Sequence, residues 1–308
     1  MKKIGVIINP NAKKFRTGKV PMKTYQNYKS ENVFIDTPQN IEELKDAVNR
    51  YTLNKPDYIC IGGGDGTIHI VLSELINAFL PGSVPPILIL KEGTMNNIAR
   101  SIKLKGAGHL LLKQLLSKIN ENKPVETEDR FTINIQDKYC FLFGTGIVTN
   151  FLNEVYAGKE KGLIRNLQVA LKSLKEAAFN VKDGEIFRLI EQAIFIDEKK
   201  VLINPVFGIL AGTVEHIGMG FSPLIDAVQP DGKFQAIVMG TQPKAILKNL
   251  NKIKNGKKIK SPKYLNALGK SILIKQKGFF DYTMDGDIYK AENILKISIG
   301  PKVALVKI

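Results

Sequence analysis

The sequence predicts two domains: an α/β domain with a doubly wound parallel sheet, then a mostly antiparallel β-sandwich. Between Lys2 and Lys123, short apolar segments alternate with stretches of helical periodicity. This order is typical of parallel strands joined by crossover helices. After Lys123-Pro124, β-like segments predominate, as in an antiparallel sheet. We therefore expect domains at residues 1–124 and 125–308.

The elements follow from local apolar patterns. In the first domain we expect strands at Ile4 to Ile8, Asn32 to Ile35, Tyr58 to Ile61 and Ile87 to Leu90, and helices at Ile41 to Tyr51, Ile68 to Phe79 and Ala107 to Ile119. In the second we expect strands at Phe131 to Ile135, Tyr139 to Phe143, Glu185 to Phe187, Gln192 to Ile196, Val201 to Leu210, Phe234 to Met239 and Ser271 to Lys275, and one helix at Leu163 to Phe179. The last strands, about residues 289–308, are candidates to return to the first domain.

Composition places the chain among ordinary globular proteins, with 308 residues, 44% hydrophobic and 24% charged. Its apolar runs are far shorter than the roughly 20 residues that cross a bilayer. The N-terminal apolar stretch ends at Asn9-Pro10, so we interpret it as a first strand and expect a cytoplasmic protein, peripheral at the membrane. Cys60 and Cys140 lie far apart in apolar surroundings, and with three histidines they form no zinc or redox spacing.

The formal charge of +16 predicts a polyanionic partner. Eleven lysines and no acidic residue lie between Lys244 and Lys277. Within this lysine run, apolar residues alternate with lysines in a helical pattern, which fits either an amphipathic helix on an anionic membrane or a helix packed on the second domain. Nucleic-acid binding ranks last, because no stacking motif or helix-turn-helix signature accompanies the charge.

A glycine-rich turn is the strongest local signal. The strand ending at Ile61 runs into Gly62, Gly63, Gly64, Asp65, Gly66 and Thr67, and a helix follows. Glycines at such a turn let backbone N–H groups approach an anion, and the helix N-terminus adds favourable partial charge. The turn matches neither the G-x-x-x-x-G-K-[ST] nor the G-x-G-x-x-G pattern. We interpret it as a phosphate-binding loop; tight packing alone is the alternative.

Several motifs together resemble the diacylglycerol kinase catalytic family. Gly63-Gly64-Asp65-Gly66-Thr67 is similar to the G-G-D-G-T signature that this family shares with sphingosine, ceramide and NAD kinases. The segment from Ile89 to Arg100 resembles the P-x-G-T-x-N-D-x-A-R block, which NAD kinases lack. Asn9-Pro10-Asn11-Ala12 resembles the opening N-P-x-[AS]-G motif. The resemblance is closest to the short bacterial lipid kinases and implies an NAD-kinase-like first domain.

The resemblance implies which residues contact ATP. They are Asn9, Pro10, Asn11, Ala12, Lys13, Thr37, Gly63, Gly64, Asp65, Gly66, Thr67, Ile68, His69, Ile70, Gly93, Thr94 and Asn96. Three departures from the family pattern change polarity or charge. His69-Ile70 replaces Asn-Glu, Asn97 replaces Asp, and the proline before G-T is replaced within Lys91-Glu92.

Two carboxylates are candidates for the chemistry of phosphoryl transfer, which needs Mg²⁺ and a proton acceptor. Asp65 in the phosphate loop could hold Mg²⁺. Asp285, in Tyr282-Thr283-Met284-Asp285-Gly286-Asp287, resembles the family's D-G-E block, which implies a general base. The alternative for Asp285 is an Asp-Gly turn between strands.

A second Asp-Gly pair resembles the stretch that binds a structural Mg²⁺ in bacterial members. It lies in Val228-Gln229-Pro230-Asp231-Gly232-Lys233. The resemblance implies the Asp231 carboxylate and the carbonyls of Val228 and Lys233 as ligands, which suits a hard cation. A simple hairpin is the alternative.

Together these features predict an ATP- and Mg²⁺-dependent lipid kinase that acts on diacylglycerol or a related lipid at a membrane surface. Two other functions stay open: a soluble-nucleotide kinase similar to NAD kinase, and a weakened nucleotide- or lipid-binding regulator. The Gly93 to Arg100 block argues against the first, and the presence of Asp65, Thr94 and Asp285 argues against the second.

Overall fold

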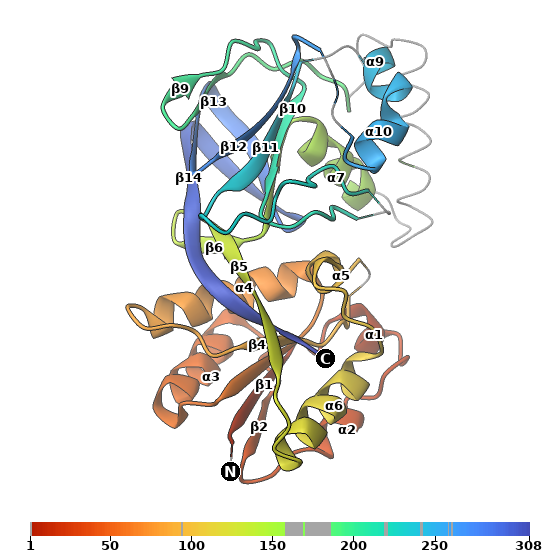
Figure 1. Cartoon of the computed structure of the whole chain (residues 1–308), viewed down its shortest axis with the longest axis vertical. Coiled ribbons are helices and arrows are strands. Elements are labelled where there is room, and N and C mark those ends of the chain that lie inside the picture. Colours follow the sequence, from red (N-terminus) through yellow and green to blue (C-terminus); the bar gives the residue numbers. More distant parts are fainter. Residues whose placement is uncertain are drawn as a thin grey trace. The chain divides into compact units, whose positions relative to one another are not determined.

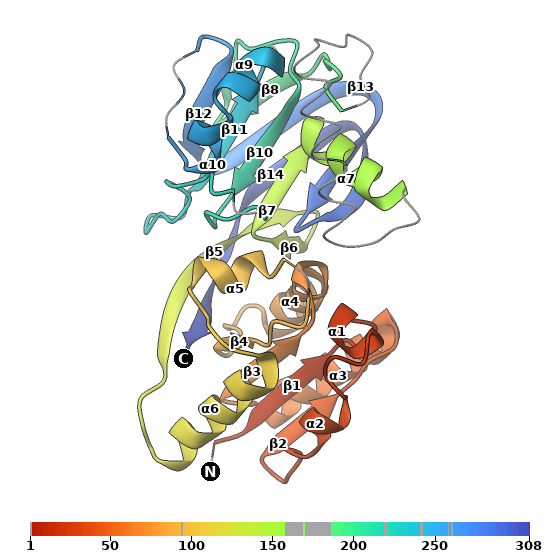
Figure 2. The same cartoon turned by 90° about the vertical axis from the view of Figure 1, so that its right-hand side faces the viewer.

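A computed structural model describes residues 2–93, 95–157, 169, 186–218, 221–240, 243–257, 259 and 261–308. The chain forms two compact units, each described here by itself (Figure 1, Figure 2). The first comprises Met1–Thr132, Asp137–Tyr139 and Gly300–Ile308. The second comprises Ile133–Gln136 and Cys140–Ile299.

A parallel sheet forms the centre of the first unit, with strand order β2-β1-β3-β4-β14. The strands are β1 (Ile4–Ile8), β2 (Val33–Asp36), β3 (Tyr58–Gly62), β4 (Ile87–Ile89) and the end of β14 (Asp287–Lys307). Ile4 lies opposite both Val33 and Tyr58, and Ile87 lies opposite Leu305. β1 and β3 are buried along their whole length, as expected for parallel strands between helical layers.

Six helices accompany this sheet in the part of the unit that the structure describes. They are α1 (Lys13–Arg16), α2 (Lys23–Gln26), α3 (Ile41–Asn54), α4 (Asp65–Phe79), α5 (Asn97–Ser101) and α6 (Gly108–Asn120). Helix α3 begins after Asn40, whose side-chain oxygen accepts the N–H of Glu43 at 2.9 Å. The ring of Tyr51 on α3 lies so close to Gly5 that a Cβ there would overlap it. Gly5 thus lets α3 lie directly on β1.

Antiparallel strands form the second unit, in the order β12-β11-β10-β7-β13-β14, with β8 beside β13 and β9 beside β8. They are β7 (Leu142–Thr145), β8 (Ala193–Ile196), β9 (Lys199–Lys200), β10 (Gly208–Gly212), β11 (Phe234–Met239), β12 (Tyr264–Gly269), β13 (Ser271–Met284) and the first part of β14. Strands β5 (Glu126–Ile135), β6 (Lys138–Cys140) and β14 have residues in both units. Alternate residues of β13 and β14, including Ile272, Ile274, Leu295 and Ile297, enter one core. The parallel and antiparallel halves confirm the predicted fold class.

Three helices of the second unit lie on one side of its strands in Figure 1. They are α7 (Ile147–Ala157), α9 (Pro243–Lys248) and α10 (Leu250–Lys254). Among the described residues, no helix has the length and hydrophobicity that a bilayer span requires.

Three sequence predictions for the second unit need correction or fall outside the described residues. Val201 to Leu210 is not one strand: β10 begins at Gly208, and Pro205, which lacks an N–H for a ladder, precedes it after a cis peptide bond. Ile186 and Phe187 lie in a turn instead of a strand. The helix expected at Leu163 to Phe179 lies outside the described residues except for Val169, and helix α7 was not expected.

Candidate functional site

Three loops of the first unit meet beyond the carboxyl ends of its parallel strands. They follow β1, β3 and β4, where α/β proteins place their ligand sites. The side chain of Asn9 donates to the hydroxyl of Thr67 at 2.9 Å, and its backbone N–H donates to the carbonyl of Gly62 at 2.8 Å. The N–H of Glu92 donates to the carbonyl of Gly63 at 3.1 Å. These hydrogen bonds therefore bring together the three loops that contain most of the residues predicted to contact ATP.

Glycine is needed in these loops because the neighbouring chain segments approach very closely. A Cβ on Gly93 would overlap the Cα of Gly64, whereas a Cβ on Gly64 would lie 3.3 Å from the Cα of Gly93. A Cβ on Gly63 would overlap Thr67. Gly64 is the N-cap of α4, so the N–H groups of the first turn of a 15-residue helix begin at this contact. Packing explains Gly63 and Gly93, and the helix N-terminus provides the donors for a phosphate.

Asp65 opens α4 and is nearly buried. One carboxylate oxygen accepts the N–H of Asn97 at 3.2 Å, so Asp65 lies at the start of α5. Burial raises the pKa of Asp65 to about 6, although the N–H groups of Asn96 to Ile98 and the charge of Arg100 act in the opposite direction. Within the described residues, the other oxygen Oδ1 of Asp65 and the Oδ1 of Asn97 are buried without a hydrogen-bond partner.

The chemistry of these two oxygens indicates whether Mg²⁺ would fit beside Asp65. A carboxylate and an amide oxygen are hard ligands, and Mg²⁺ is commonly held by one or two carboxylates together with substrate phosphates. The described residues contain no group of three or more His, Cys, Asp or Glu side chains arranged for a metal ion. The donor set at Asp65 therefore fits a cation that arrives with a phosphorylated ligand and does not fit an all-protein cage.

The remaining predicted ATP contacts have different surroundings. His69 is buried, and its Nδ1 lies 2.8 Å from the carbonyl of Tyr139, which gives its side chain a packing role. Ile70 is partly exposed on α4. Asn96 has a left-handed backbone and closes the Gly93 loop, accepting the Gly93 N–H at 3.2 Å and donating to its carbonyl at 3.1 Å. Thr37 directly follows β2, and Thr94 lies outside the described residues.

Asp285 lies in the turn between β13 and β14 of the second unit, with a left-handed backbone. Its carboxylate accepts the N–H of Leu142 at 2.8 Å and that of Phe141 at 3.1 Å, and its own N–H donates to the carbonyl of Leu142 at 3.0 Å. Asp285 is 7% exposed. The structure therefore shows an Asp-Gly turn whose side chain anchors the start of β7, and its role as a base stays a prediction.

Asp231 of the predicted structural metal site forms an ion pair with Lys233 at 2.5 Å. This contact lowers the pKa of Asp231, and both side chains are exposed. Val228 is also exposed. A cation bound here would have to compete with the Lys233 ammonium, so the arrangement favours a surface turn. The set Val228, Asp231 and Lys233 stays a prediction.

Sequence reasoning missed a charged cluster beside the phosphate loop. Lys14 contacts Glu92 at 3.5 Å, and Tyr25 donates a hydrogen bond to the same carboxylate, which is fully buried. The only signal was the replacement of the family proline within Lys91-Glu92.

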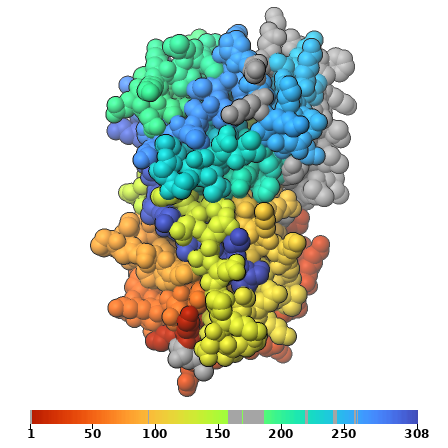
Figure 3. Space-filling model, viewed as in Figure 1, coloured from red at the N-terminus to blue at the C-terminus, as the bar shows by residue number. Residues whose placement is uncertain are grey.

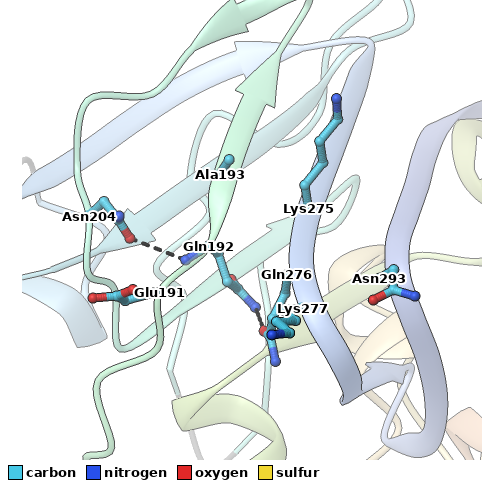
Figure 4. Close-up of a pocket in the computed structure, with 8 residues that line it drawn as sticks. All are labelled: Glu191, Gln192, Ala193, Asn204, Lys275, Gln276, Lys277 and Asn293. Atoms are coloured by element: carbon cyan, nitrogen blue, oxygen red, sulfur yellow. Dashed lines mark hydrogen bonds between the residues drawn. The ribbon is translucent and has the colours of Figure 1, made fainter.

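A separate pocket of about 440 Å³ lies in the second unit (Figure 4). It is lined by Glu191, Gln192, Ala193, Asn204, Lys275, Gln276, Lys277 and Asn293, none of which is a predicted site residue. The Gln192 side chain donates to the Gln276 oxygen at 2.5 Å, and the Gln192 N–H donates to the Asn204 side chain at 3.1 Å. These bonds occupy much of the polar lining.

We predict that Asp65 makes stability depend on pH. Its folded pKa of about 6 lies above the unfolded value of about 3.9, so the protonated form favours folding. Stability is then greatest below about pH 4 and falls by about 2 to 3 kcal/mol as the pH rises through 6. Denaturant unfolding of wild type and Asp65→Asn at pH 4, 5, 6 and 7.5 should show this loss only in the wild type. Identical pH profiles would contradict the prediction.

Comparisons with known proteins support the same reading. Residues 3–126 match the family model of the diacylglycerol kinase catalytic domain. No curated protein matches the sequence. Three solved structures from Bacillus anthracis str. Sterne share the fold: one is described as a diacylglycerol kinase and two are provisionally described as diacylglycerol kinases. They are 17%, 15% and 16% identical, with TM-scores of 0.73, 0.66 and 0.69, and each alignment covers 100% of this chain and 97% of the other. The matched residues 3–126 include the glycine-rich turn and the Gly93 to Arg100 block, whose motifs resemble this family.

Proposed function

We propose that this protein is an ATP-dependent lipid kinase that transfers a phosphate to a hydroxyl of diacylglycerol or a related lipid. One observation carries the proposal: the glycine loops at Gly64 and Gly93 touch beside the nearly buried carboxylate of Asp65, within the segment that matches the diacylglycerol kinase catalytic domain. The proposal is also supported by the N-terminus of α4 at this edge of the sheet and by the buried oxygens of Asp65 and Asn97 that lack a hydrogen-bond partner among the described residues.

In this mechanism the first unit binds and orients the nucleotide. Backbone N–H groups from Gly64 onward face the phosphates, and the loop after β1 closes over them through the bond from Asn9 to Thr67. Asp65, with Asn97 beside it, would hold Mg²⁺ together with phosphate oxygens, and the ion would offset phosphate charge during transfer. Asp285 would accept the proton of the lipid hydroxyl. Both of its oxygens accept backbone N–H groups, so the substrate hydroxyl would either share an oxygen with one of these donors or displace it.

Two other functions are possible for the same fold, one with a different phosphate acceptor and one without phosphate transfer. A soluble-nucleotide kinase similar to NAD kinase would use the same phosphate loop, and a regulator would bind nucleotide or lipid without turnover. The replacement of Asp by Asn97, whose Oδ1 lacks a hydrogen-bond partner among the described residues, favours weakened Mg²⁺ binding. This observation keeps the regulator as the second candidate.

The lysine run is our proposed contact with an anionic membrane. Helices α9 and α10 form part of the molecular surface in Figure 3, and Lys248, Lys252 and Lys254 are exposed. Ile246 and Leu247 pack against the buried cluster around Phe207. The apolar side of α9 is therefore used at least partly inside the unit, and the proposed membrane contact is mainly electrostatic. No nucleic-acid partner is proposed.

Incubation with labelled ATP, Mg²⁺ and a panel of lipid micelles tests the function. We expect phosphate on a lipid for the wild type and none for Gly64→Val, because a side chain there occupies the space beside the helix N-terminus. Ser83→Val, a small-to-large change in the exposed loop after α4, should keep activity. Phosphate on NAD would favour the soluble-nucleotide kinase, and ATP binding without any phosphorylated product would favour the regulator.

For Asp285 we predict that Asp285→Asn lowers turnover by at least about 100-fold, the usual contribution of a positioned base, with little change in ATP affinity. The matched control is Asp281→Asn on the same strand. Because Asp285 also anchors Phe141 and Leu142, the melting temperature of each variant is measured. Full turnover in Asp285→Asn would refute the catalytic role, and loss of both ATP binding and stability would assign Asp285 to structure.

Membrane attachment is tested by vesicle sedimentation. Wild-type binding to anionic vesicles should fall steeply with added salt, since screening shortens the reach of each lysine. The pair Lys252→Glu and Lys254→Glu should weaken binding by about tenfold or more, at about 1 kcal/mol for each lysine. Lys45→Glu with Lys113→Glu, an equal charge change on exposed residues of the first unit, should not. Binding that does not depend on salt, or equal effects of the two pairs of substitutions, would show that the lysine run is a solvent-exposed surface without a membrane contact.

A further inference from the structure

Glu92 is a fully buried carboxylate next to the phosphate loop. It directly precedes Gly93, and its N–H donates to the carbonyl of Gly63, so its backbone belongs to the contact between the two glycine loops. Its side chain points elsewhere, toward Lys14 and Tyr25. A buried carboxylate needs such partners, because an unpaired one is strongly unfavourable.

The residues around Glu92 leave space for its side chain. A Cβ on Gly108, the first residue of α6, would overlap a Glu92 oxygen and lie 2.5 Å from the Tyr25 hydroxyl. Tyr25 is itself buried, and its ring lies edge-on to Phe15 with centroids 5.8 Å apart. Burial and the neighbouring Glu92 raise the pKa of Tyr25, which keeps it a hydrogen-bond donor. Elements α1, α2 and α6 thus converge on one carboxylate.

Lys14 is held in place by this carboxylate. Its ammonium lies 3.5 Å from Glu92 and donates to the carbonyl of Lys91, and its backbone N–H donates to the carbonyl of Glu92 at 3.5 Å. An ammonium has three N–H donors, and these contacts use at most two. The Lys14 side chain is 29% exposed, so its charge still reaches solvent. It follows directly after the Asn9 to Lys13 segment that the family resemblance assigns to ATP.

Lys91 supplies a second cation at the same place. Its ammonium donates to the carbonyl of Leu104 at 3.0 Å. Partial burial lowers the pKa of Lys91, and the nearby charges of Lys14 and Arg100 lower it further, only partly offset by Glu92. Lys14 and Arg100 are therefore each within electrostatic reach of Lys91. A bound polyanion would relieve their repulsion.

We propose that Lys14 and Lys91 form a cationic subsite for the outer phosphates of a nucleoside triphosphate, and that Glu92 is the positioning residue that orients Lys14. The inference rests on the proposed function and deepens it. Both lysines flank the loop that presses Gly93 onto Gly64, where α4 begins. Lys91 and Glu92 occupy the place where this chain departs from the family pattern, and Lys14 follows the segment that resembles the family's opening motif.

The subsite is tested by calorimetric titration of ATP, ADP and AMP in the presence of Mg²⁺, without any lipid. Lys14→Gln and Lys91→Gln should each weaken ATP binding by about tenfold or more, the loss of one charge-assisted contact. Affinity for AMP should change less than about twofold, because AMP lacks the outer phosphates. Lys23→Gln, which removes the same charge from an exposed position on α2, should leave all three affinities unchanged.

The positioning role needs a separate readout. Glu92→Gln should reduce the ratio of ATP to AMP affinity, and combining it with Lys14→Gln should add little further loss, since both changes remove the same oriented cation. Tyr25→Phe, which keeps the ring and removes the donor, should lower stability more than it lowers this ratio. A Glu92→Gln protein with a lower melting temperature and an unchanged ratio would overturn the positioning role.

Failure of the subsite is distinguishable from failure of the proposed function. ATP binding that survives both lysine substitutions unchanged overturns the subsite alone. A wild-type protein that binds none of the three nucleotides overturns the proposed function and the subsite with it.

Discussion

The close approach of Gly93 to Gly64 is the constraint on which the first unit's candidate site depends. Two loops from neighbouring parallel strands can lie this close because Gly93 has no Cβ, which would overlap the Cα of Gly64, whereas a Cβ on Gly64 would make a tight contact of 3.3 Å. Their contact orients the start of α4, lets the Glu92 N–H reach the carbonyl of Gly63 and brings the N-terminus of α5 to Asp65. The same glycines therefore allow the two backbones to pack closely at the helix N-terminus, where our proposed function places the phosphates.

Two carboxylates, the nearly buried Asp65 and the fully buried Glu92, lie beside this contact and differ in the charge next to them. Asp65 is surrounded by backbone N–H groups, yet one of its oxygens lacks a partner among the described residues, and burial raises its pKa. Glu92 accepts the Tyr25 hydroxyl through Oε1, and its Oε2, which has no hydrogen-bond partner among the described residues, lies 3.5 Å from the Lys14 ammonium. Because burial penalises charge, an incompletely satisfied carboxylate is favoured only when a ligand completes its surroundings. Asp65 is therefore poised for a cation or a proton, whereas Glu92 is suited to orient a neighbour.

The second unit shows how a structural turn can also carry a candidate base. Asp285 accepts two backbone N–H groups that would otherwise be unpaired at the break between β6 and β7. Anchoring of this kind limits the rotamers of the side chain, which is useful for a positioned base and is equally useful for a turn alone. The geometry supports both roles, and the difference lies in whether substrate can replace one of the backbone donors.

From the sequence alone it was possible to predict the parallel strands, the glycine-rich strand-to-helix turn and the resemblance to the diacylglycerol kinase family, because apolar periodicity and glycine spacing are local. The limits of β1 and β11 agree with the pattern for the same reason. Interactions between distant residues decided the rest. His69, one of the predicted ATP contacts, is hydrogen-bonded through Nδ1 to the carbonyl of Tyr139, which lies 70 positions away. Ile246 and Leu247 of the lysine run pack against a buried cluster. In the sequence, Lys91-Glu92 is visible only as the replacement of a family proline. The structure shows that α1, α2 and α6 converge on the Glu92 carboxylate, which is buried and contacts Lys14 and Tyr25. Burial and partner identity are properties of tertiary packing, so no local pattern could supply them.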